Sequence, residues 1–396
     1  MDFDGIYLDY NATTPVDPRV CERMDEVARS FFGNPSSTHG PGRRAAEVFE
    51  QAKAQVAELL GGRPEEICFT AGGSESDNLA LKGVVLPSLC RGEKPHVIIS
   101  RVEHPAVNES CRWLEEVGAE VTRLGVAADG TLDPAAVAAA FRDNTVMVSL
   151  MLANNETGVI FPVAEISKLT RERGIIFHTD AVQAFGKIPI DVNQLQVDLL
   201  SVSGHKVYAP KGVGALWIRS GIELTPLIHG GSQESGRRAG TENLVGIAAF
   251  GRACEILRTE MEFEGERIRM LRDGLETELA AQLGQELFFH GHSRLRVPNT
   301  SSLSVPYLDS EALLTYLDLE NISVSAGSAC SSSEHQGSPV LQAMGVSPDL
   351  ARGALRISLG RWTDQAQIDI FIEKFVAVVR RLWAISPLRK KVASPE

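Results

Sequence analysis

Ser201-Val202-Ser203-Gly204-His205-Lys206 is the stretch of sequence from which the expected fold is worked out. It closes an apolar run that begins at Val197 and that we expect to be a buried strand. Another short apolar run, Ile175-Ile176-Phe177-His178-Thr179, ends on an acid at Asp180, and Gln183 follows three residues later. The sequence therefore predicts two buried strands, one followed by a carboxylate and the other by a lysine.

This arrangement suits an aromatic cofactor that is bound covalently through nitrogen. A desolvated lysine has a lowered pKa and attacks aldehydes, and a carboxylate beside a pyridine nitrogen keeps that nitrogen protonated. A lysine Schiff base with an acidic partner for the ring is typical of pyridoxal 5'-phosphate (PLP). The alternative is that Lys206 is a surface lysine after a strand, but Asp180 and Gln183 favour the cofactor interpretation.

Strand and helix patterns alternate along the first part of the chain. Strands are expected at 67–70, 97–100, near 121, at 146–152 and at 213–218, with helices between them. Short apolar strands without polar alternation indicate a mostly parallel sheet covered on both faces, in an α/β fold. Ligands in such sheets bind at the carboxyl ends of the strands. His104, Asn155, Asp180 and Lys206 each follow such an end.

The pattern changes after Asn243. A long helical segment is expected over 244–283, broken near Glu264-Gly265, and the strands and helices that follow indicate a smaller α+β domain. We expect residues 1–15 to join this small domain, residues 16–255 to form the large domain, and residues 256–396 to form the small domain. A Gly/Ser-rich loop at 325–338 of the small domain carries Cys330.

The composition excludes several classes of function. The 396 residues are 43% hydrophobic and 23% charged, with a net charge of −12, which argues against non-specific binding to nucleic acid or to an anionic membrane. No apolar run approaches the length of a membrane helix, and Met1-Asp2-Phe3-Asp4 does not resemble a signal peptide. The six cysteines form no C-x-x-C pair, so we expect reduced thiols in a cytoplasmic protein and no metal site.

Three further groups suit a bound phosphate and ring. Gly72-Gly73-Ser74 opens a helix, where backbone N–H groups and the helix dipole favour an anion, although a tight turn with an N-cap is the alternative. Ser203 and His205 offer further hydrogen bonds to phosphate, or else cap the local turn. His104 is placed to stack on a flat ring and move protons, or else is structural.

Cys330 lies among small and polar residues, as an accessible nucleophile requires. Arg356 is a charge within an expected strand, where a substrate carboxylate would pair with it. A rival pattern is Ser203-x-x-Lys206, which together with Ser76-Asp77-Asn78 matches the serine acyl-transferase motifs. The order of those motifs is reversed here and no K-T-G follows, so the pattern weighs little.

Several motifs resemble, in order and over nearly the whole chain, those of the group I cysteine desulfurases, the NifS/IscS-like branch of the class-V aminotransferase family. The motifs are Asp9-Tyr10-Asn11-Ala12-Thr13-Thr14-Pro15, Glu75-Ser76-Asp77-Asn78, Glu103-His104, Asn154-Asn155-Glu156-Thr157-Gly158, Asp180-Ala181-Val182-Gln183, Ser203-Gly204-His205-Lys206, Arg238-Ala239-Gly240-Thr241-Glu242-Asn243 and Ser328-Ala329-Cys330. The resemblance implies a homodimer with the PLP-dependent transferase fold type I. It also implies conversion of L-cysteine to L-alanine, with a persulfide left on the enzyme.

The resemblance also assigns a role to each candidate residue. Lys206 would hold PLP and move the Cα proton, and Cys330 would take the substrate sulfur. The expected cofactor ligands are Asp180 at the ring nitrogen, Gln183 at the ring oxygen, His104 stacked on the ring, Asn155, and a phosphate site of Gly73, Ser74, Ser203, His205 and the partner subunit's Thr241. Asn11, Asn155 and Arg356 would hold the substrate carboxylate.

The chain departs from the family in places. Ser74 stands where threonine is frequent, and the segment after Cys330 is unusually polar. The sulfur acceptor is therefore left open between an iron–sulfur scaffold, a tRNA-thiolation carrier and another protein. Two other functions stay in view: a PLP lyase for selenocysteine or another β-substituted amino acid, and a non-catalytic sulfur carrier. The presence of Lys206, Asp180, His104 and Cys330 together argues against the carrier.

Overall fold

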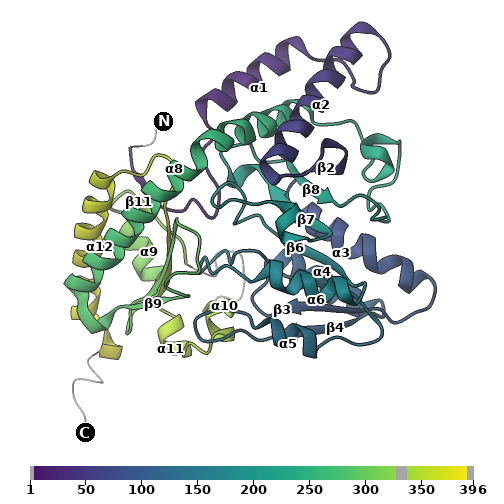
Figure 1. Cartoon of the computed structure of the whole chain (residues 1–396). Coiled ribbons are helices and arrows are strands. Elements are labelled where there is room, and N and C mark those ends of the chain that lie inside the picture. The colour runs from purple at the N-terminus through teal and green to yellow at the C-terminus, as the bar shows by residue number, and fades with distance from the viewer. Residues whose placement is uncertain (1–3, 327–336, 390–396) are drawn as a thin grey trace.

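The computed structural model of the protein describes residues 4–326 and 337–389, and its centre is a seven-stranded sheet (Figure 1). The strands lie in the order β2 (Ile67–Thr70), β8 (Gly214–Ile218), β7 (Leu199–Ser203), β6 (Ile176–Asp180), β5 (Thr145–Ser149), β3 (His96–Ser100) and β4 (Glu120–Leu124). All neighbouring pairs are parallel except those that β8 makes with β2 and β7. The expectation of a mostly parallel sheet is confirmed.

Helices cover both faces of this sheet. Helices α3 (Gly73–Cys90) and α4 (Pro105–Glu116) pack on one face, whereas α2 (Gly40–Leu60), α6 (Val163–Glu172) and part of α8 (Leu244–Leu283) pack on the other. Because side chains alternate along a strand, Val97 and Ile99 of β3 join the first core and Ile98 joins the second. All three are fully buried, which explains why these strands show no polar alternation.

Helix α8 is a single helix of 40 residues, and the break expected near Glu264-Gly265 is wrong. A glycine inside a helix costs only about 1 kcal/mol relative to alanine, so tertiary contacts can outweigh it. Here the first half of α8 packs against α1 (Pro18–Ser30) and α2. In the second half Glu264 pairs with Arg361, and the long helix crosses the molecule from α1 to β9 (Figure 1).

A third hydrophobic core lies at the other end of α8. Strand β10 (Thr300–Ser304) pairs antiparallel with β12 (Ala354–Ser358) and β9 (Phe288–His290), and α9 (Ser310–Asp318) and α12 (Gln365–Ile385) pack with them. Strand β1 (Ile6–Tyr7) runs parallel to β11 (Ile322–Ser323), and Leu8 is fully buried in this core. The division at 255/256 stays a prediction, and that position falls inside α8.

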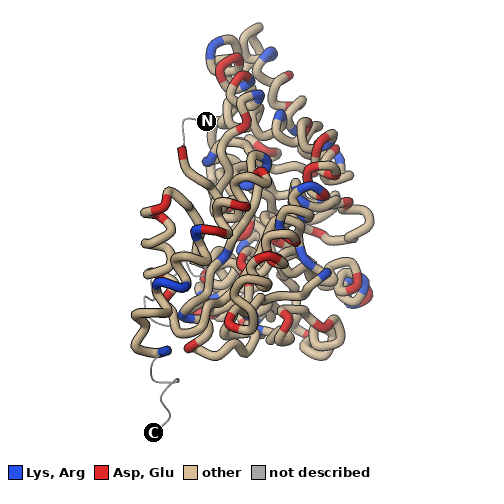
Figure 2. Tube along the Cα trace, turned by 90° about the vertical axis from the view of Figure 1, so that its left-hand side faces the viewer, with Lys and Arg blue, Asp and Glu red and all other residues tan. Residues whose placement is uncertain are grey.

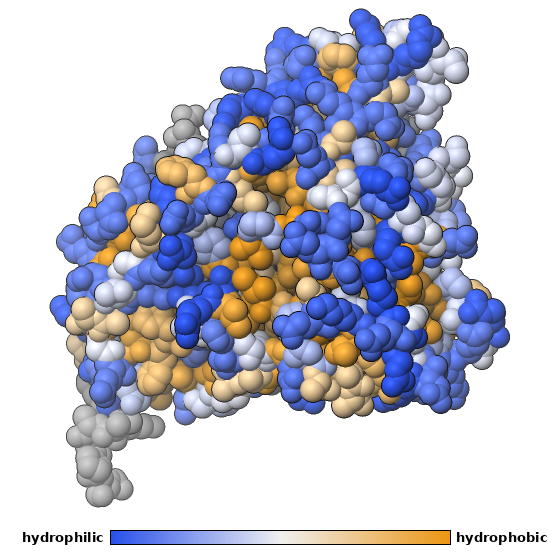
Figure 3. Space-filling view, in the orientation of Figure 1, coloured by the Kyte–Doolittle hydropathy of each residue, from blue (hydrophilic) through white to orange (hydrophobic). Residues whose placement is uncertain are grey.

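The remaining elements are short. They are the helices α5 (Pro134–Ala139), α7 (Val192–Leu195), α10 (Pro339–Ala343) and α11 (Pro348–Ala351), and single 3-10 turns at Pro64–Glu66, Gly204–Lys206, Gln233–Gly236 and Gly284–Glu286. Acidic and basic residues are mixed along the chain in Figure 2. Hydrophobic side chains gather in the middle of the face shown in Figure 3, between mostly hydrophilic outer helices. Over residues 4–326 and 337–389, the structure contains no helix with the length and apolar character needed to cross a membrane.

Candidate active site

The structure brings the residues expected at the strand ends to one edge of the central sheet. Asp180 is the last residue of β6, and Lys206 ends the 3-10 turn that follows β7. His104 follows β3 and caps the N-terminus of α4, where its Nδ1 accepts the N–H of Ala106 at 3.1 Å. Asn155 follows β5. Since β7, β6, β5 and β3 are consecutive parallel neighbours, their carboxyl ends share this edge.

Asp180, His104 and Lys206 are close enough to influence one another electrostatically. Burial lowers the pKa of His104, the Asp180 carboxylate opposes that shift, and the Lys206 cation adds to it. Burial also raises the pKa of Asp180, against the effects of His104, the Val182 N–H and Lys206. The Asp180 carboxylate therefore depends on nearby positive charge for its stability, and a protonated ring nitrogen would supply such a charge.

Residues that are expected to bind phosphate lie beside the start of α3. Gly72 has a φ of 155°, and a Cβ at Gly73 would lie only 2.8 Å from the side chain of Val182, so the chain passes too close for any other residue. The hydroxyl of Ser203 is buried and has no hydrogen-bond partner among the residues that the structure describes. His205 pairs through Nδ1 with the hydroxyl of Thr13 at 3.1 Å, and burial lowers its pKa to about 4.

The N-terminal segment closes over the lysine. Nζ of Lys206 donates to the carbonyl oxygens of Asn11 at 2.6 Å and Ala12 at 2.7 Å. The N–H of Thr14 donates to the carbonyl of His205, and the Thr14 hydroxyl accepts the N–H of Tyr208 at 2.8 Å. Residues 11–14 thus fix both sides of the lysine turn by backbone contacts that carry no obvious sequence signal.

Of the three residues expected to hold a substrate carboxylate, Arg356 and Asn11 both contact the backbone carbonyl of Asn155. The guanidinium of Arg356 donates to the carbonyl of Asn155 at 3.1 Å and to the carboxylate of Asp9 at 2.8 Å. Its Nε is buried and has no partner among the described residues. Nδ2 of Asn11 donates to the same Asn155 carbonyl at 3.2 Å. A buried cation with an unused donor at this position suits an anionic ligand.

Comparisons with known proteins agree with this geometry. The family described as aminotransferase class-V matches residues 6–371. A relative from Dictyoglomus turgidum, named cysteine desulfurase IscS, is 45% identical over 386 residues, which are 98% of this chain and 97% of that protein. A solved NifS-like protein has a TM-score of 0.89 at 36% identity and covers 96% of this chain and 100% of its own. The NifS-like protein of Rickettsia africae has a TM-score of 0.85 at 34% identity, with coverages of 95% and 99%.

This chain belongs to the class-V aminotransferase family, among its cysteine desulfurases. Enzymes of this family depend on PLP. The residues of the chain fit that cofactor: the unpartnered Ser203 hydroxyl faces the glycine turn, where Gly72 approaches it, and Asp180 lies at the same sheet edge. A phosphate in this turn would satisfy a donor that otherwise carries a desolvation cost.

Cys330, the residue expected to take the substrate sulfur, lies outside the residues that the structure describes. The segment that carries it begins after Ser325, which exchanges two backbone hydrogen bonds with Arg356, and ends before Ser338, whose hydroxyl donates to the buried carboxyl of Glu156. Thr241 is exposed, in the stretch between Gln233–Gly236 and α8. Its role across a subunit interface stays a prediction.

Two buried acids and one partly buried lysine, to which no role is predicted from the sequence, also lie near the candidate site residues. Asp77 lies 3.6 Å from Nε2 of His178, and burial and then the charge of Asp180 raise its pKa well above the usual range. Burial raises the pKa of Glu103 to about 8. Lys187 contacts Asn11 and Gln183. Asp77 lies within α3, Glu103 lies between β3 and α4, and Lys187 lies in the segment after β6, and the sequence of these segments does not show that the three groups are removed from solvent.

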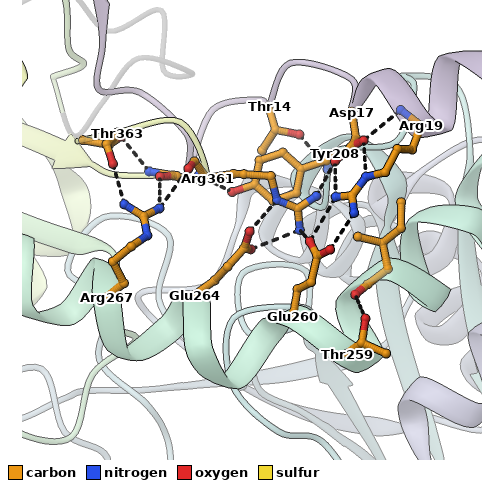
Figure 4. A network of polar contacts seen from close by, with 12 residues as sticks. Thr14, Asp17, Arg19, Tyr208, Thr259, Glu260, Glu264, Arg267, Arg361 and Thr363 are labelled. Atoms are coloured by element: carbon orange, nitrogen blue, oxygen red, sulfur yellow. Dashed lines mark hydrogen bonds and ion pairs between the residues drawn. The ribbon is translucent and has the colours of Figure 1, made fainter.

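A charged network holds the lysine turn against α8 (Figure 4). The guanidinium of Arg361 lies 4.5 Å from the ring centroid of Tyr208, two residues after Lys206, and pairs with Glu264 at 2.6 Å and with Asp17. The Tyr208 hydroxyl also accepts the backbone N–H of Arg361 at 2.9 Å. The network joins the start of α1, the middle of α8 and the segment after β12, and it fixes the turn that carries Lys206.

Proposed function

We propose that this chain converts L-cysteine to L-alanine and carries the released sulfur as a persulfide on Cys330. The observation that carries the proposal is the convergence of Lys206, Asp180 and His104 at one sheet edge, beside the unpartnered Ser203 hydroxyl. When bound, PLP withdraws electrons from the substrate Cα, which stabilises the electron pair left on the neighbouring Cβ when that carbon loses sulfur. The family relatives support the same activity through the name of the Dictyoglomus turgidum protein.

The other binding and proton-transfer roles belong to individual residues of the chain. Asp180 holds the ring nitrogen, Gln183 the ring oxygen, and Gly73, Ser74, Ser203 and His205 the phosphate. Arg356, with Asn155 and Asn11, orients the substrate carboxylate, and His104 stacks on the ring. Lys206 holds PLP and moves the Cα proton.

The sulfur step balances without any added oxidant. The Cys330 thiolate attacks the substrate sulfur, an S–S bond forms, the C–S bond breaks, and its electron pair stays on carbon. Protonation of that carbon gives alanine, and the enzyme keeps one sulfur atom. The fixed ends of the Cys330 segment support this role, because Ser325 pairs with the strand that carries Arg356.

The persulfide must then pass to a thiol on another protein. We propose a protein acceptor, either an iron–sulfur scaffold or a thiolation carrier, and no direct action on nucleic acid or membrane. We also propose a cytoplasmic homodimer, in which Thr241 of the partner subunit completes the phosphate site. The free thiols of Cys21, Cys68, Cys90, Cys111 and Cys254 suit a reducing compartment.

A test of this function measures alanine and enzyme-bound sulfane sulfur after addition of L-cysteine. Cys330→Ser should lose both products and keep the visible absorbance of bound PLP. Cys21→Ser, which changes an exposed free cysteine, is the matched control and should retain activity. Full alanine production by Cys330→Ser would refute the role of Cys330. Turnover of selenocysteine alone would instead support the selenocysteine lyase, and partner binding without alanine would support the carrier.

A further inference from the structure

Lys187 is held close to the cofactor lysine by the turn that precedes it. Gly186 has a φ of 71°, and a Cβ there would lie 2.7 Å from the side chain of Val207, the residue after Lys206. The two lysines also line the same small cavity, of about 30 Å³, together with Tyr208, Glu264 and Asn299. The backbone of this turn therefore packs directly on the lysine turn of the active site.

The amine of Lys187 binds two amide oxygens of predicted site residues. Nζ donates to Oδ1 of Asn11 at 2.9 Å and to Oε1 of Gln183 at 2.7 Å. An amide whose oxygen faces a lysine must turn its NH₂ group the other way. Nε2 of Gln183 accordingly donates to the carbonyl of Asn11 at 3.0 Å, the oxygen that also accepts from Lys206.

The two amides differ in how much they depend on Lys187. Oδ1 of Asn11 also accepts Nδ2 of Asn299 at 3.0 Å, and Nδ2 of Asn11 donates to the hydroxyl of Thr300 at 2.8 Å. Oε1 of Gln183, in contrast, accepts only from Lys187 within the part of the chain that the structure describes. Loss of Lys187 would leave the Asn11 amide held by Asn299 and Thr300. Within the described part of the chain it would leave the Gln183 amide held by the single bond from its Nε2 to the Asn11 carbonyl.

The electrostatic surroundings of Lys187 do not suggest a simple salt bridge. Burial lowers the pKa of Lys187 well below its usual range, and the cations of Lys206 and Arg356 act in the same direction. Among the described residues its amine makes contacts with amides and forms no ion pair with a carboxylate. An amine donates two such hydrogen bonds whether or not it is protonated.

We propose that Lys187 is a positioning residue that fixes the amide orientation of Gln183, and thereby the N–H that Gln183 presents toward the PLP ring oxygen. The inference rests on the proposed function, because it needs Gln183 to face that oxygen. The amine of Lys187 contacts the side chains of Asn11 and Gln183. It acts through Gln183, with Asn11 as a second, independently held partner.

The test follows the pH midpoint of the visible band of the bound PLP in the purified holoenzyme. A donor at the ring oxygen favours the state in which that oxygen is more negative. Lys187→Met should therefore raise the midpoint by about one pH unit, the shift expected for loss of one hydrogen bond to a charged oxygen. Lys187→Arg keeps a donor and should stay near wild type. Lys168→Met, on the exposed face of α6, is the control.

A double-mutant cycle separates positioning through Gln183 from a general effect. In a Gln183→Leu background, Lys187→Met should shift the midpoint by less than about 0.3 pH unit further. An unchanged midpoint in the single variant, or full additivity in the pair, would overturn the proposal. If Lys187→Met does not fold, Lys187→Ala, which also removes the donor, takes its place in both arms. A wild-type protein that binds no PLP or makes no alanine would instead refute the proposed function.

Discussion

Glu103 provides a test of whether burial keeps a carboxyl group beside the candidate active site protonated at neutral pH. Its carboxyl is buried beside His104, accepting the N–H of Met151 at 2.9 Å and sharing a 2.5 Å hydrogen bond with the hydroxyl of Ser100. Burial raises its pKa from the usual 4.5 to about 8, and the charge of Asp180 adds to this shift. At neutral pH the folded protein therefore keeps Glu103 protonated, whereas the unfolded chain ionises it.

The sign of the effect on stability follows from proton binding. Between about pH 5 and pH 8 the folded state binds one proton more than the unfolded state at this position, so stability falls as pH rises. The slope for one proton is about 1.4 kcal/mol per pH unit, which gives a loss of about 4 kcal/mol over three units. Below the ordinary glutamate pKa both states are protonated, and above about pH 8 both are ionised, so the slope from this group vanishes there.

Glu103→Gln removes the titration and keeps the shape. The glutamine amide can donate to Ser100 and accept from Met151, as the protonated acid does. We expect the free energy of unfolding of the variant, relative to wild type, to increase by about 1.4 kcal/mol per pH unit from pH 5 to pH 8. Taking this difference cancels the other titrating groups, which both proteins share.

Urea unfolding at a series of pH values, at fixed protein and PLP concentrations, measures this difference. Glu116→Gln, at an exposed position on α4, controls for the loss of a surface carboxylate and should keep the wild-type profile. A Glu103→Gln profile parallel to that of wild type across the whole range would refute the reasoning. It would mean that Glu103 is ionised in the folded protein despite its burial.

Two further predictions concern the lysine turn and the phosphate pocket. Arg361→Met leaves Asp17 and Glu264 without their shared buried cation, and we expect a loss of roughly 3–5 kcal/mol in urea unfolding. A loss below 1 kcal/mol would show that the network in Figure 4 contributes little. Ser203→Ala removes a buried hydroxyl that has no partner among the described residues, so stability without PLP should not fall. Equilibrium dialysis should show PLP affinity reduced about tenfold, and unchanged affinity would remove Ser203 from the phosphate site.

Much of the fold could be predicted because the strand signals are local. Runs such as Val97–Ser100 and Ile175–Asp180 are apolar on both faces, and the structure buries both faces of the strands that contain them. The unbroken helix α8 could not be predicted in the same way, because Gly265 disfavours a helix locally and only tertiary contacts outweigh that local preference. Its continuity depends on contacts with residues far away in sequence, among them Arg361.

The candidate site shows the same division between local and long-range information. Asp180 and Lys206 could be found because each directly follows an apolar run. Lys187 could not, because a lysine in the segment Gly186-Lys187-Ile188 is indistinguishable in sequence from a solvated one. Its buried contacts with Asn11 and Gln183 form only when the N-terminal segment folds back over the sheet edge.

Asn11 illustrates why pattern alone does not assign a ligand. The resemblance to the family implies that Asn11 contacts the substrate, and the structure places it against Lys206, Gln183 and Asn155. Its side chain accepts from Lys187 and Asn299 and donates to Asn155 and Thr300, which uses the full hydrogen-bonding capacity of an amide. A substrate carboxylate bound by Asn11 must therefore displace one of these partners, whereas Arg356 already has an unused buried N–H to offer. We therefore expect Arg356 to be the stronger anchor, and Asn11 ties the N-terminal segment to the groups that we propose to orient the cofactor.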